Sequence, residues 1–454
     1  MPVPVRPGSF SRSSPYPTRW RKAKKNRQPP ALTTEDKRPS CRNKPFKPDL
    51  PDIAKITPCL KSLMTMPAVD APAKFGDFGG QFAPELQMDI LLDLLPEFNR
   101  ILSDDAFWTD FFACPLTRPS PLHLAQNLTQ AVGGANVWLK REDLSPFGSY
   151  LARTIVGQIL FARRIGKTEI VMECGFAGHG LVCVTMCARV KMKCTIFMGA
   201  SDVQTQAKAV RKMRQLGAAV ISAKSTGGNA ETGTETGTLR EAINEAIRYS
   251  MTCLDSTYHI ASGTVGPHPI PSITRTFQSL LGLEIRNAFE RVPGNTRKSA
   301  NIEPAAIISH TGSSCAAALG LFTPFISSTD TTPKLVAVEA ATAAPLTYGS
   351  VGVMYGCKTL VLQDDNGQIL PSHAMNRAQD MSFPCAGPEM AYWKDSERLW
   401  SVAVEEEDAL KGLDILFEYE GVKAGMTTGY AVLEALRVAK ELGRGRDVVV
   451  LVSG

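Results

Sequence analysis

Polar residues that could act in chemistry follow two of the predicted strands of this chain. Glu173 ends a short apolar segment, residues 169–173, and a turn of His, Thr, Gly and Ser residues, 310–315, follows another at 305–309. A carboxylate at a strand end can accept a proton, and backbone N–H and hydroxyl groups at a strand-to-helix turn can bind an anion. Each also has a structural interpretation, as a residue of the fold or as an ordinary capped helix start.

The order of the predicted elements indicates how these residues are positioned. Short, continuously apolar strands alternate with helices, which is typical of buried parallel sheets that are covered by helices. Strands are predicted at residues 136–140, 169–173, 194–198, 218–222, 305–309, 334–339 and 447–452. Helices are predicted at residues 86–102, 157–165, 180–191, 204–216, 239–249, 316–325, 406–420 and 429–441. Ligands of such folds bind at the carboxyl ends of the strands. The section between the strand at 334–339 and the helix at 406–420 is expected to be irregular.

The charge of the chain is unevenly distributed. Its formal net charge is +6 over 454 residues. The excess of basic residues lies in residues 1–34, which contain no Asp or Glu. The remainder is close to balanced, so neither a nucleic-acid surface nor a membrane surface is expected on the folded body. No apolar run reaches the roughly 18–20 residues that a membrane helix needs.

The first 72 residues are predicted to form a disordered basic extension, because they carry few apolar side chains to offset the entropy of ordering. The acid-free start fits an organelle presequence, and the basic cluster at residues 19–27 fits a nuclear-import patch. An unspecific basic tail fits equally, and a cytoplasmic location is expected for the protein.

Eleven cysteines are scattered along the chain without a CxxC pair. Cys183 and Cys187 are four residues apart on a predicted helix, but no second pair and no nearby His completes a zinc set. The cysteines are therefore predicted to be reduced core thiols, and no metal site is predicted.

A series of motifs carries a family resemblance. The chain contains, in this order, FGDFGGQFAPE, RPSPL, LKREDL, ECGFAGHG, FMGASDVQTQ, GTVGPHPIP, VAVEA, QDDNGQI, EYEGV and a final VSG. Over residues 75–454 this series resembles the tryptophan synthase β-subunit, a fold-type II enzyme family that uses pyridoxal phosphate (PLP). The resemblance implies an α/β fold with two three-layer α/β/α domains, mostly parallel sheets and the site between them.

The resemblance also implies domain boundaries. The N-terminal domain would comprise residues 73–116 and 150–275, with a mobile subdomain around residues 166–260. The C-terminal domain would comprise residues 117–149 and 276–454. The family further implies a homodimer, contact with an α-subunit, and a small ligand that is an amino acid or indole.

The resemblance places functional residues on this chain position by position. The Schiff-base lysine corresponds to Leu151, which cannot form an imine. The family's catalytic carboxylate corresponds to Glu173. Cofactor contacts are expected from Gly312, Ser313, Ser314, Ser453 and Glu420. Substrate contacts are expected from Gly175, Gly178, His179 and Asn366.

Other positions depart from the family pattern. Tyr150 stands where the family has a histidine, and Asn366 stands where it has a gating aspartate. Phe176 is expected to crowd the substrate carboxylate loop. Ser453 is retained, but we expect the end of its strand to fray. Lys140 belongs to the KRED motif and is predicted to be a structural salt-bridge partner.

These departures favour a tryptophan synthase β-like protein that is catalytically impaired or repurposed. The family reaction joins L-serine and indole to L-tryptophan by PLP-dependent β-replacement. Two alternatives remain at this point. One is an enzyme of altered chemistry that uses its pocket with Glu173 as base. The other is an active PLP-dependent lyase whose gene model is faulty at the active site.

Overall fold

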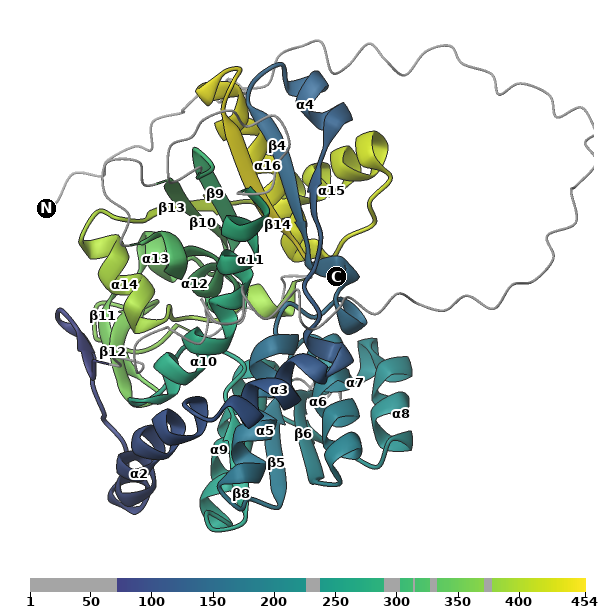
Figure 1. The fold of residues 1–454 in the computed structure, drawn as a ribbon. Helices are drawn as coiled ribbons and strands as arrows, with labels where there is room; N and C mark the ends of the chain where they lie inside the picture. Colours follow the sequence, from purple (N-terminus) through teal and green to yellow (C-terminus); the bar gives the residue numbers. More distant parts are fainter. Residues whose placement is uncertain (1–71, 226–236, 290–302, 313–314, 327–332, 371–377) are drawn as a thin grey trace, which may run out of the picture. The chain divides into compact units, whose positions relative to one another are not determined.

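The computed structural model describes residues 72–225, 237–289, 303–312, 315–326, 333–370 and 378–454 (Figure 1). The described residues belong to one compact unit. The basic extension that the sequence predicts lies outside the described residues, apart from Pro72.

One sheet has six strands, of which five are parallel (Figure 1). Their order is β13 (Trp400–Val404), β10 (Lys334–Ala340), β9 (Ala306–His310), β14 (Asp447–Val452), β4 (Asn136–Arg141) and β3 (Leu122–Leu124). Only β3, at the edge, runs antiparallel to its neighbour. The last strand of the chain, β14, therefore lies inside the sheet between β9 and β4.

Both faces of this sheet are covered by helices. Successive side chains of a strand point to opposite faces. In β9, Ile307 belongs to the apolar core that contains α12 (Ala316–Phe322), whereas Ile308 belongs to the core that contains α16 (Met426–Leu442). Apolar side chains at consecutive positions thus produce a three-layer arrangement.

A second sheet has four strands, all parallel. Their order is β7 (Ala219–Ala223), β6 (Lys193–Gly199), β5 (Glu169–Glu173) and β8 (Thr257–Ile260). Met172 faces a core shared with α5 (Ala152–Arg164) and α6 (Ala177–Val190), and Val171 faces α9 (Leu239–Thr252). The predicted α/β architecture of two helix-covered, mostly parallel sheets is confirmed. The division of the chain into two domains remains a prediction.

Aromatic residues join the helices that flank the second sheet. Phe277 of α10 (Ile270–Gln278) stacks on Phe111 of α3 (Asp105–Ala113) at a centroid distance of 5.8 Å. The same ring meets Phe98 of α2 (Glu85–Leu102) edge-on at 5.7 Å. The helix that follows α10 is α11 (Leu280–Phe289). Neither α10 nor α11 is among the predicted helices, and β8 is not among the predicted strands.

The section between β10 and α15 (Glu406–Glu420), which the sequence predicts to be irregular, contains regular structure. Its elements include α13 (Pro345–Tyr348), β11 (Ser350–Met354), β12 (Cys357–Val361), α14 (Pro388–Asp395) and β13. The hairpin β11–β12 joins β1 (Lys74–Phe75) and β2 (Phe78–Gly79) in a third sheet. Tyr355 and Gly356 connect its strands with φ angles of 46° and 85°, as a tight hairpin turn requires.

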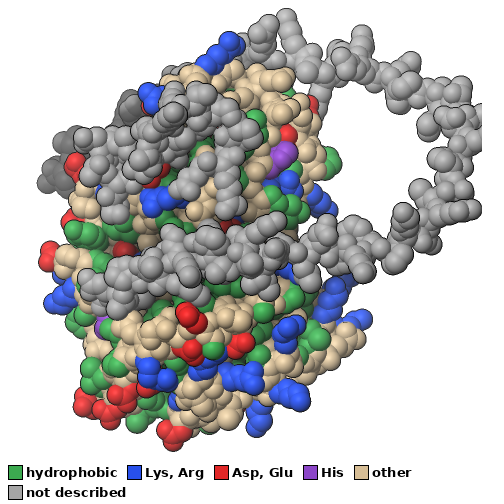
Figure 2. All heavy atoms as spheres, viewed as in Figure 1, with side chains coloured by type: hydrophobic (Ala, Val, Ile, Leu, Met, Phe, Trp, Pro, Cys, Tyr) green, Lys and Arg blue, Asp and Glu red, His purple; other side chains and the backbone are tan. Residues whose placement is uncertain are grey.

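The predicted helix at residues 204–216 is interrupted. The structure has α7 (Ala200–Thr205) and α8 (Ala207–Gln215), with Gln206 between them at φ −106°. The exposed side of α8 is basic because it carries Lys208, Arg211, Lys212 and Arg214. On the face drawn in Figure 2, side chains of both signs are otherwise interspersed. Among the described residues, no helix combines the length and the apolar character that crossing a membrane requires.

A buried ion-pair network fixes the start of α5. The guanidinium of Arg153 pairs with the Glu142 carboxylate at 2.9 Å and with the Glu284 carboxylate at 2.8 Å. Lys140 donates to Glu284 and, at 2.8 Å, to the carbonyl of Ser120. Burial disfavours the charged form of Glu142, but Arg153 and Lys140 outweigh it and lower the pKa of that carboxyl. Lys140 therefore has the ion-pair contacts that the sequence predicts for it.

We expect Arg153→Met to lower the free energy of unfolding by about 3–5 kcal/mol, because it leaves two buried carboxylates without their guanidinium. Urea denaturation measures the change. Arg248→Met is the matched control. Arg248 pairs with Glu245 on the surface, so its loss should cost less than about 1 kcal/mol. Equal effects of the two substitutions would contradict a structural role for the network.

Candidate functional site

Four segments meet at the position where the resemblance places the cofactor. They are the carboxyl ends of β9 and β14 and the segments that lead into α5 and α6. Leu151 precedes α5 and is completely buried. The preceding lysine of the chain, Lys140, is held in the ion-pair network. The position of the Schiff-base lysine thus offers a buried apolar side chain.

Tyr150 is buried between His179 and His310. Its ring lies edge-on to the rings of His179 and His310, at centroid distances of 4.8 Å and 5.1 Å. Its hydroxyl donates to the Asp380 carboxylate at 3.0 Å. The hydroxyl also lies against Gly312, where an added Cβ would be only 2.7 Å from the oxygen. The tyrosine therefore occupies the room beside the only glycine described in the predicted anion-binding turn.

Asp380 and His179 form one hydrogen-bonded chain with Ser149. His179 Nε2 lies 2.9 Å from the same Asp380 oxygen, and His179 Nδ1 lies 2.7 Å from the Ser149 hydroxyl. Burial disfavours the Asp380 carboxylate, but the charge and hydrogen bond of His179 and the hydrogen bond of Tyr150 outweigh it. They hold the pKa of Asp380 below its usual range. Both nitrogens of the histidine are therefore used within the protein.

His310 and Ser453 form a second chain. His310 Nδ1 accepts from the backbone N–H of Gly312 at 3.2 Å, so its Nε2 can donate to the Ser453 hydroxyl at 3.1 Å. Ser453 also contacts the Thr427 hydroxyl at 2.7 Å, and its backbone N–H donates to Thr428. Instead of fraying, the end of β14 is thus buried and held by hydrogen bonds. Burial lowers the pKa of His310 to about 4, so this imidazole is neutral.

In the part of this site that the structure describes, the side chains leave little volume for a cofactor. The cavity beside Asp380 measures about 10 Å³ and is lined by Thr311, Cys315 and Phe383 among others. That is room for one water, whereas sites for cofactors are typically about 300–1,000 Å³. With no amine at Leu151 and with Ser453 bonded to His310, the residues present do not fit PLP.

The segment that leads into α6 is closed by its neighbours. The Gln206 side chain donates to the carbonyl of Gly175 at 2.6 Å and accepts from the N–H of Ala177 at 2.7 Å. A Cβ on Gly178 would lie 2.3 Å from the Phe176 ring. That ring packs edge-on to His179 at 5.1 Å, so it takes up the space that the sequence predicted it would crowd.

The other residues that were predicted to contact the cofactor or the substrate lie away from this position or outside the described residues. The Glu420 carboxylate accepts from the Leu128 N–H in α4 (Gln126–Val132) at 2.9 Å. Glu420 is not among the residues that line the cavity beside Asp380. Asn366 lies in an exposed turn, where its N–H donates to Asp364. Ser313 and Ser314 are outside the described residues.

Glu173 lies at a different cavity, a chamber of about 500 Å³. Most of its lining is apolar and comes from α2, α9, the segment before α10 and the β11–β12 turn. Side chains in this wall include Leu91, Leu94, Ile243, Val265, Tyr355 and Phe383. The chamber therefore has the size and character of a site for a small apolar molecule.

The polar part of the chamber is a constellation around the Glu173 carboxylate. One oxygen accepts from the backbone N–H and the hydroxyl of Ser262, at 2.8 Å and 2.9 Å. The other oxygen lies 2.6 Å from His259 Nε2. The strands β5 and β8 bring these groups together, because Val171 pairs with His259 in register and Glu173 follows on the same face. The pair can orient a ligand that donates a hydrogen bond and can exchange a proton with it.

Comparison with known proteins decides the family. The family model for pyridoxal-phosphate dependent enzymes matches residues 114–454. The chain belongs to this family. It is 34% identical to the tryptophan synthase beta chain of Jannaschia sp. over 407 residues, covering 87% of this chain and 94% of that protein. This relationship makes it a tryptophan synthase β-like protein, and the cofactor of its family is PLP.

A second relative agrees with this placement, and two solved structures share the fold. The chain is 39% identical to tryptophan synthase of Saccharomyces cerevisiae over 393 residues, which is 84% of this chain but about half, 53%, of the yeast protein. A fungal L-serine ammonia-lyase from Rhizomucor miehei has a TM-score of 0.54 at 17% identity, covering 74% of this chain and 93% of that one. O-acetyl serine sulfhydrylase isoform 3 from Entamoeba histolytica has a TM-score of 0.53 at 16% identity, covering 74% and 86%. At these identities the structures support the fold alone.

Sequence reasoning missed several of the residues that determine this site. Asp380 lies in a section with no predicted element, so nothing indicated that its carboxylate would join Tyr150 to His179. His259 lies in β8, a strand that was not predicted, and Ser262 follows this strand. The available signal was the apolar and aromatic pattern of residues 257–260, directly before the GTVGPHPIP motif.

We expect His310 to make stability depend on pH. Its pKa of about 4 in the folded state lies below the ordinary 6.5 of an unfolded chain, so the unfolded state binds the proton first as pH falls. Stability should decrease between pH 6.5 and pH 4, with a contribution of about 2 kcal/mol already lost at pH 5.

The substitution His310→Gln keeps a donor and an acceptor but removes the titration. The fall in unfolding free energy from pH 7 to pH 5, measured with urea, should be about 2 kcal/mol smaller in this variant. Identical falls in the two proteins would mean that folded His310 binds protons as readily as the unfolded chain does.

Proposed function

We propose that this tryptophan synthase β-like protein does not catalyse PLP-dependent β-replacement and retains the chamber at Glu173 as a binding site for a small aromatic ligand. The observation that carries the proposal is the filled cofactor position, where Leu151 replaces the amine and Tyr150 occupies the space between the sheets. Dimerisation and contact with an α-subunit remain predictions from the family.

The loss of the family reaction is supported by coordinated changes. An amine alone would not restore the site, because the Tyr150 hydroxyl is bonded to Asp380 and the Ser453 hydroxyl to His310. Cofactor binding would have to break both contacts and expel a buried aromatic ring. Breaking buried hydrogen bonds of charged or neutral side chains costs about 1–3 kcal/mol each.

Ligand binding in the chamber is supported by its volume and its polarity. Apolar walls favour a flat hydrophobic molecule, and the carboxylate of Glu173 favours one that donates a hydrogen bond. Indole has both properties. His259 and Ser262 fix the carboxylate, so the ligand would meet an oriented acceptor without a rearrangement of the site.

We expect the purified full-length chain to show no internal-aldimine absorbance near 410–420 nm when PLP is added, and Leu151→Lys alone to show little. The reason is steric, because Tyr150 still fills the space in that variant. Absorbance spectroscopy before and after borohydride reduction makes the measurement. Assays for tryptophan from serine and indole should also give no product.

A PLP-competent tryptophan synthase β-subunit serves as the positive control for both assays. Circular dichroism of the Leu151→Lys protein establishes that it is folded. A borohydride-sensitive band in the unaltered chain would refute the proposal. A strong band in Leu151→Lys would show that the amine, and not the filled space, is what the site lacks.

We expect indole to bind the chain and Glu173→Gln to weaken that binding by about 10-fold, because a hydrogen bond to a charged group is worth about 1.5–3 kcal/mol. Isothermal titration calorimetry measures both affinities. The matched ligand is 1-methylindole, which has the same aromatic rings without the N–H group. It should bind both proteins with similar, weaker affinity. Equal binding of indole and 1-methylindole to the unaltered chain would rule out recognition by Glu173.

A further inference from the structure

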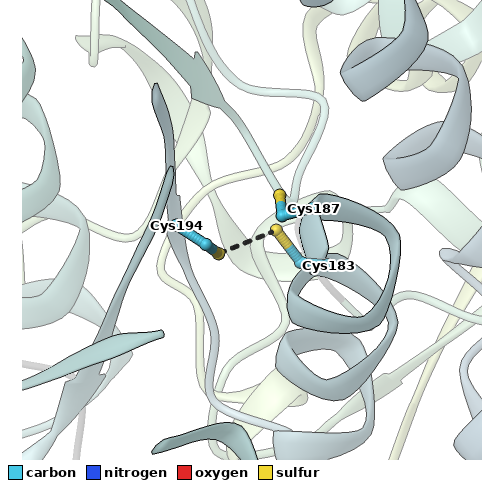
Figure 3. A group of neighbouring side chains, drawn as sticks. All are labelled: Cys183, Cys187 and Cys194. Atoms are coloured by element: carbon cyan, nitrogen blue, oxygen red, sulfur yellow. Dashed lines mark hydrogen bonds between the residues drawn. The ribbon is translucent and has the colours of Figure 1, made fainter. Parts of the chain in front are cut away.

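Three buried cysteines converge within the layer between α6 and β6 (Figure 3). Cys183 and Cys187 lie on α6 and Cys194 lies on β6. The three sulfur atoms are all within 4.8 Å of one another, and those of Cys183 and Cys194 are 3.7 Å apart. The sequence shows only the first two as a pair, since Cys194 joins them through the packing of the strand on the helix.

Local geometry explains the convergence. Residues four apart on a helix point to the same face, so Cys183 and Cys187 lie one above the other towards the sheet. Lys191 then ends α6 in the left-handed conformation, with φ of 58°, and the chain turns back into β6. The second residue of that strand is Cys194, whose side chain points into the same core.

The arrangement has the chemistry of a soft-metal site. Thiolate sulfur is the ligand that Cu(I), zinc and iron–sulfur clusters prefer in proteins. Three sulfurs around one metal at about 2.3 Å in a plane would be about 4.0 Å apart. The measured separations, 3.7 Å for one pair and at most 4.8 Å for the others, need only small side-chain adjustments to reach this value.

The number of ligands distinguishes between metals. A structural zinc site is closed by four ligands, and the cluster has three members among the His, Cys, Asp and Glu side chains of the described residues. Three converging sulfurs without a fourth ligand suit a soft ion of low charge and low coordination number.

We propose that Cys183, Cys187 and Cys194 form a three-coordinate thiolate site for Cu(I). Binding replaces thiol protons, which leave to solvent, and requires no oxidant or reductant. Cys194, which is 7% exposed at the start of β6, is the point at which the ion would enter.

The site has a structural consequence. A bound ion would connect the middle of α6 to β6, and α6 also carries His179 at its N-terminal end. The three residues His179, Cys183 and Cys187 follow each other at intervals of four along one helix face. Metal binding should therefore stabilise the same helix that closes the filled cofactor position, without taking part in any reaction there.

The test is anaerobic titration of the full-length, reduced chain with Cu(I), delivered as its acetonitrile complex in competition with bathocuproine disulfonate. We expect one equivalent to be retained, with a sulfur-to-copper charge-transfer band in the ultraviolet and a higher Tm. Cys183→Ala should weaken the affinity by at least about 100-fold and abolish the shift in Tm. Cys194→Ala should have the same effect, because it removes the ligand that β6 supplies.

Cys253→Ser is the matched control, because Cys253 is an exposed thiol outside the cluster and its loss should leave the bound copper unchanged. Circular dichroism and urea denaturation of each variant without metal separate lost binding from lost folding. If Cys183→Ala does not fold, Cys187→Ser provides the test. Copper binding that persists in the cluster variants or disappears in Cys253→Ser would overturn the site. A Cys183–Cys194 disulfide in the chain as purified, detected by mass spectrometry without reduction, would also overturn it.

Discussion

The hydrogen bond from Tyr150 to Asp380 is the contact on which the interior of this protein depends. It places an aromatic ring between two histidines and joins the segment before α5 to the segment before α14. A buried carboxylate is costly unless it is paired, and here the phenol and His179 both bind one of its two oxygens. The space between the two sheets, where ligands of parallel α/β folds usually bind, is thereby part of the hydrophobic and polar core.

Two cavities lined by described residues differ greatly in volume. At the carboxyl ends of β9 and β14, close packing leaves about 10 Å³, and His310 and Ser453 satisfy each other. At the carboxyl end of β5, about 500 Å³ remains open beside Glu173. The chamber walls come mainly from α2, α9 and the hairpin, and Phe383 lines both cavities. Side chains thus fill the first position, whereas the second has the volume of a pocket for a small molecule.

In both helix-covered regions of the structure, buried charged side chains are paired with neighbouring polar or charged groups. Arg153, Glu142 and Glu284 compensate one another where α5 begins, and Glu173 is held by His259 and Ser262 where β5 ends. A buried charge without its partner is strongly destabilising. Removing one partner should therefore lower the free energy of unfolding by more than the intact pair contributes to it. These networks also fix the start of α5 and the rim of the chamber. They therefore make both regions rigid as well as stable.

The sequence by itself determined the family, the order of most strands and helices, and the absence of an amine at Leu151. It could do so because periodicity and motif order are local properties of the chain. Only the tertiary structure decided that Tyr150 meets Asp380, 230 residues away, that Ser453 is buried against His310, and that Cys194 joins Cys183 and Cys187. Those contacts depend on how separate strands and helices pack, and local patterns of residue types do not reveal that packing. The hairpin, β8 and His259 were missed for the same reason, since short elements of this kind are stabilised mainly by their neighbours.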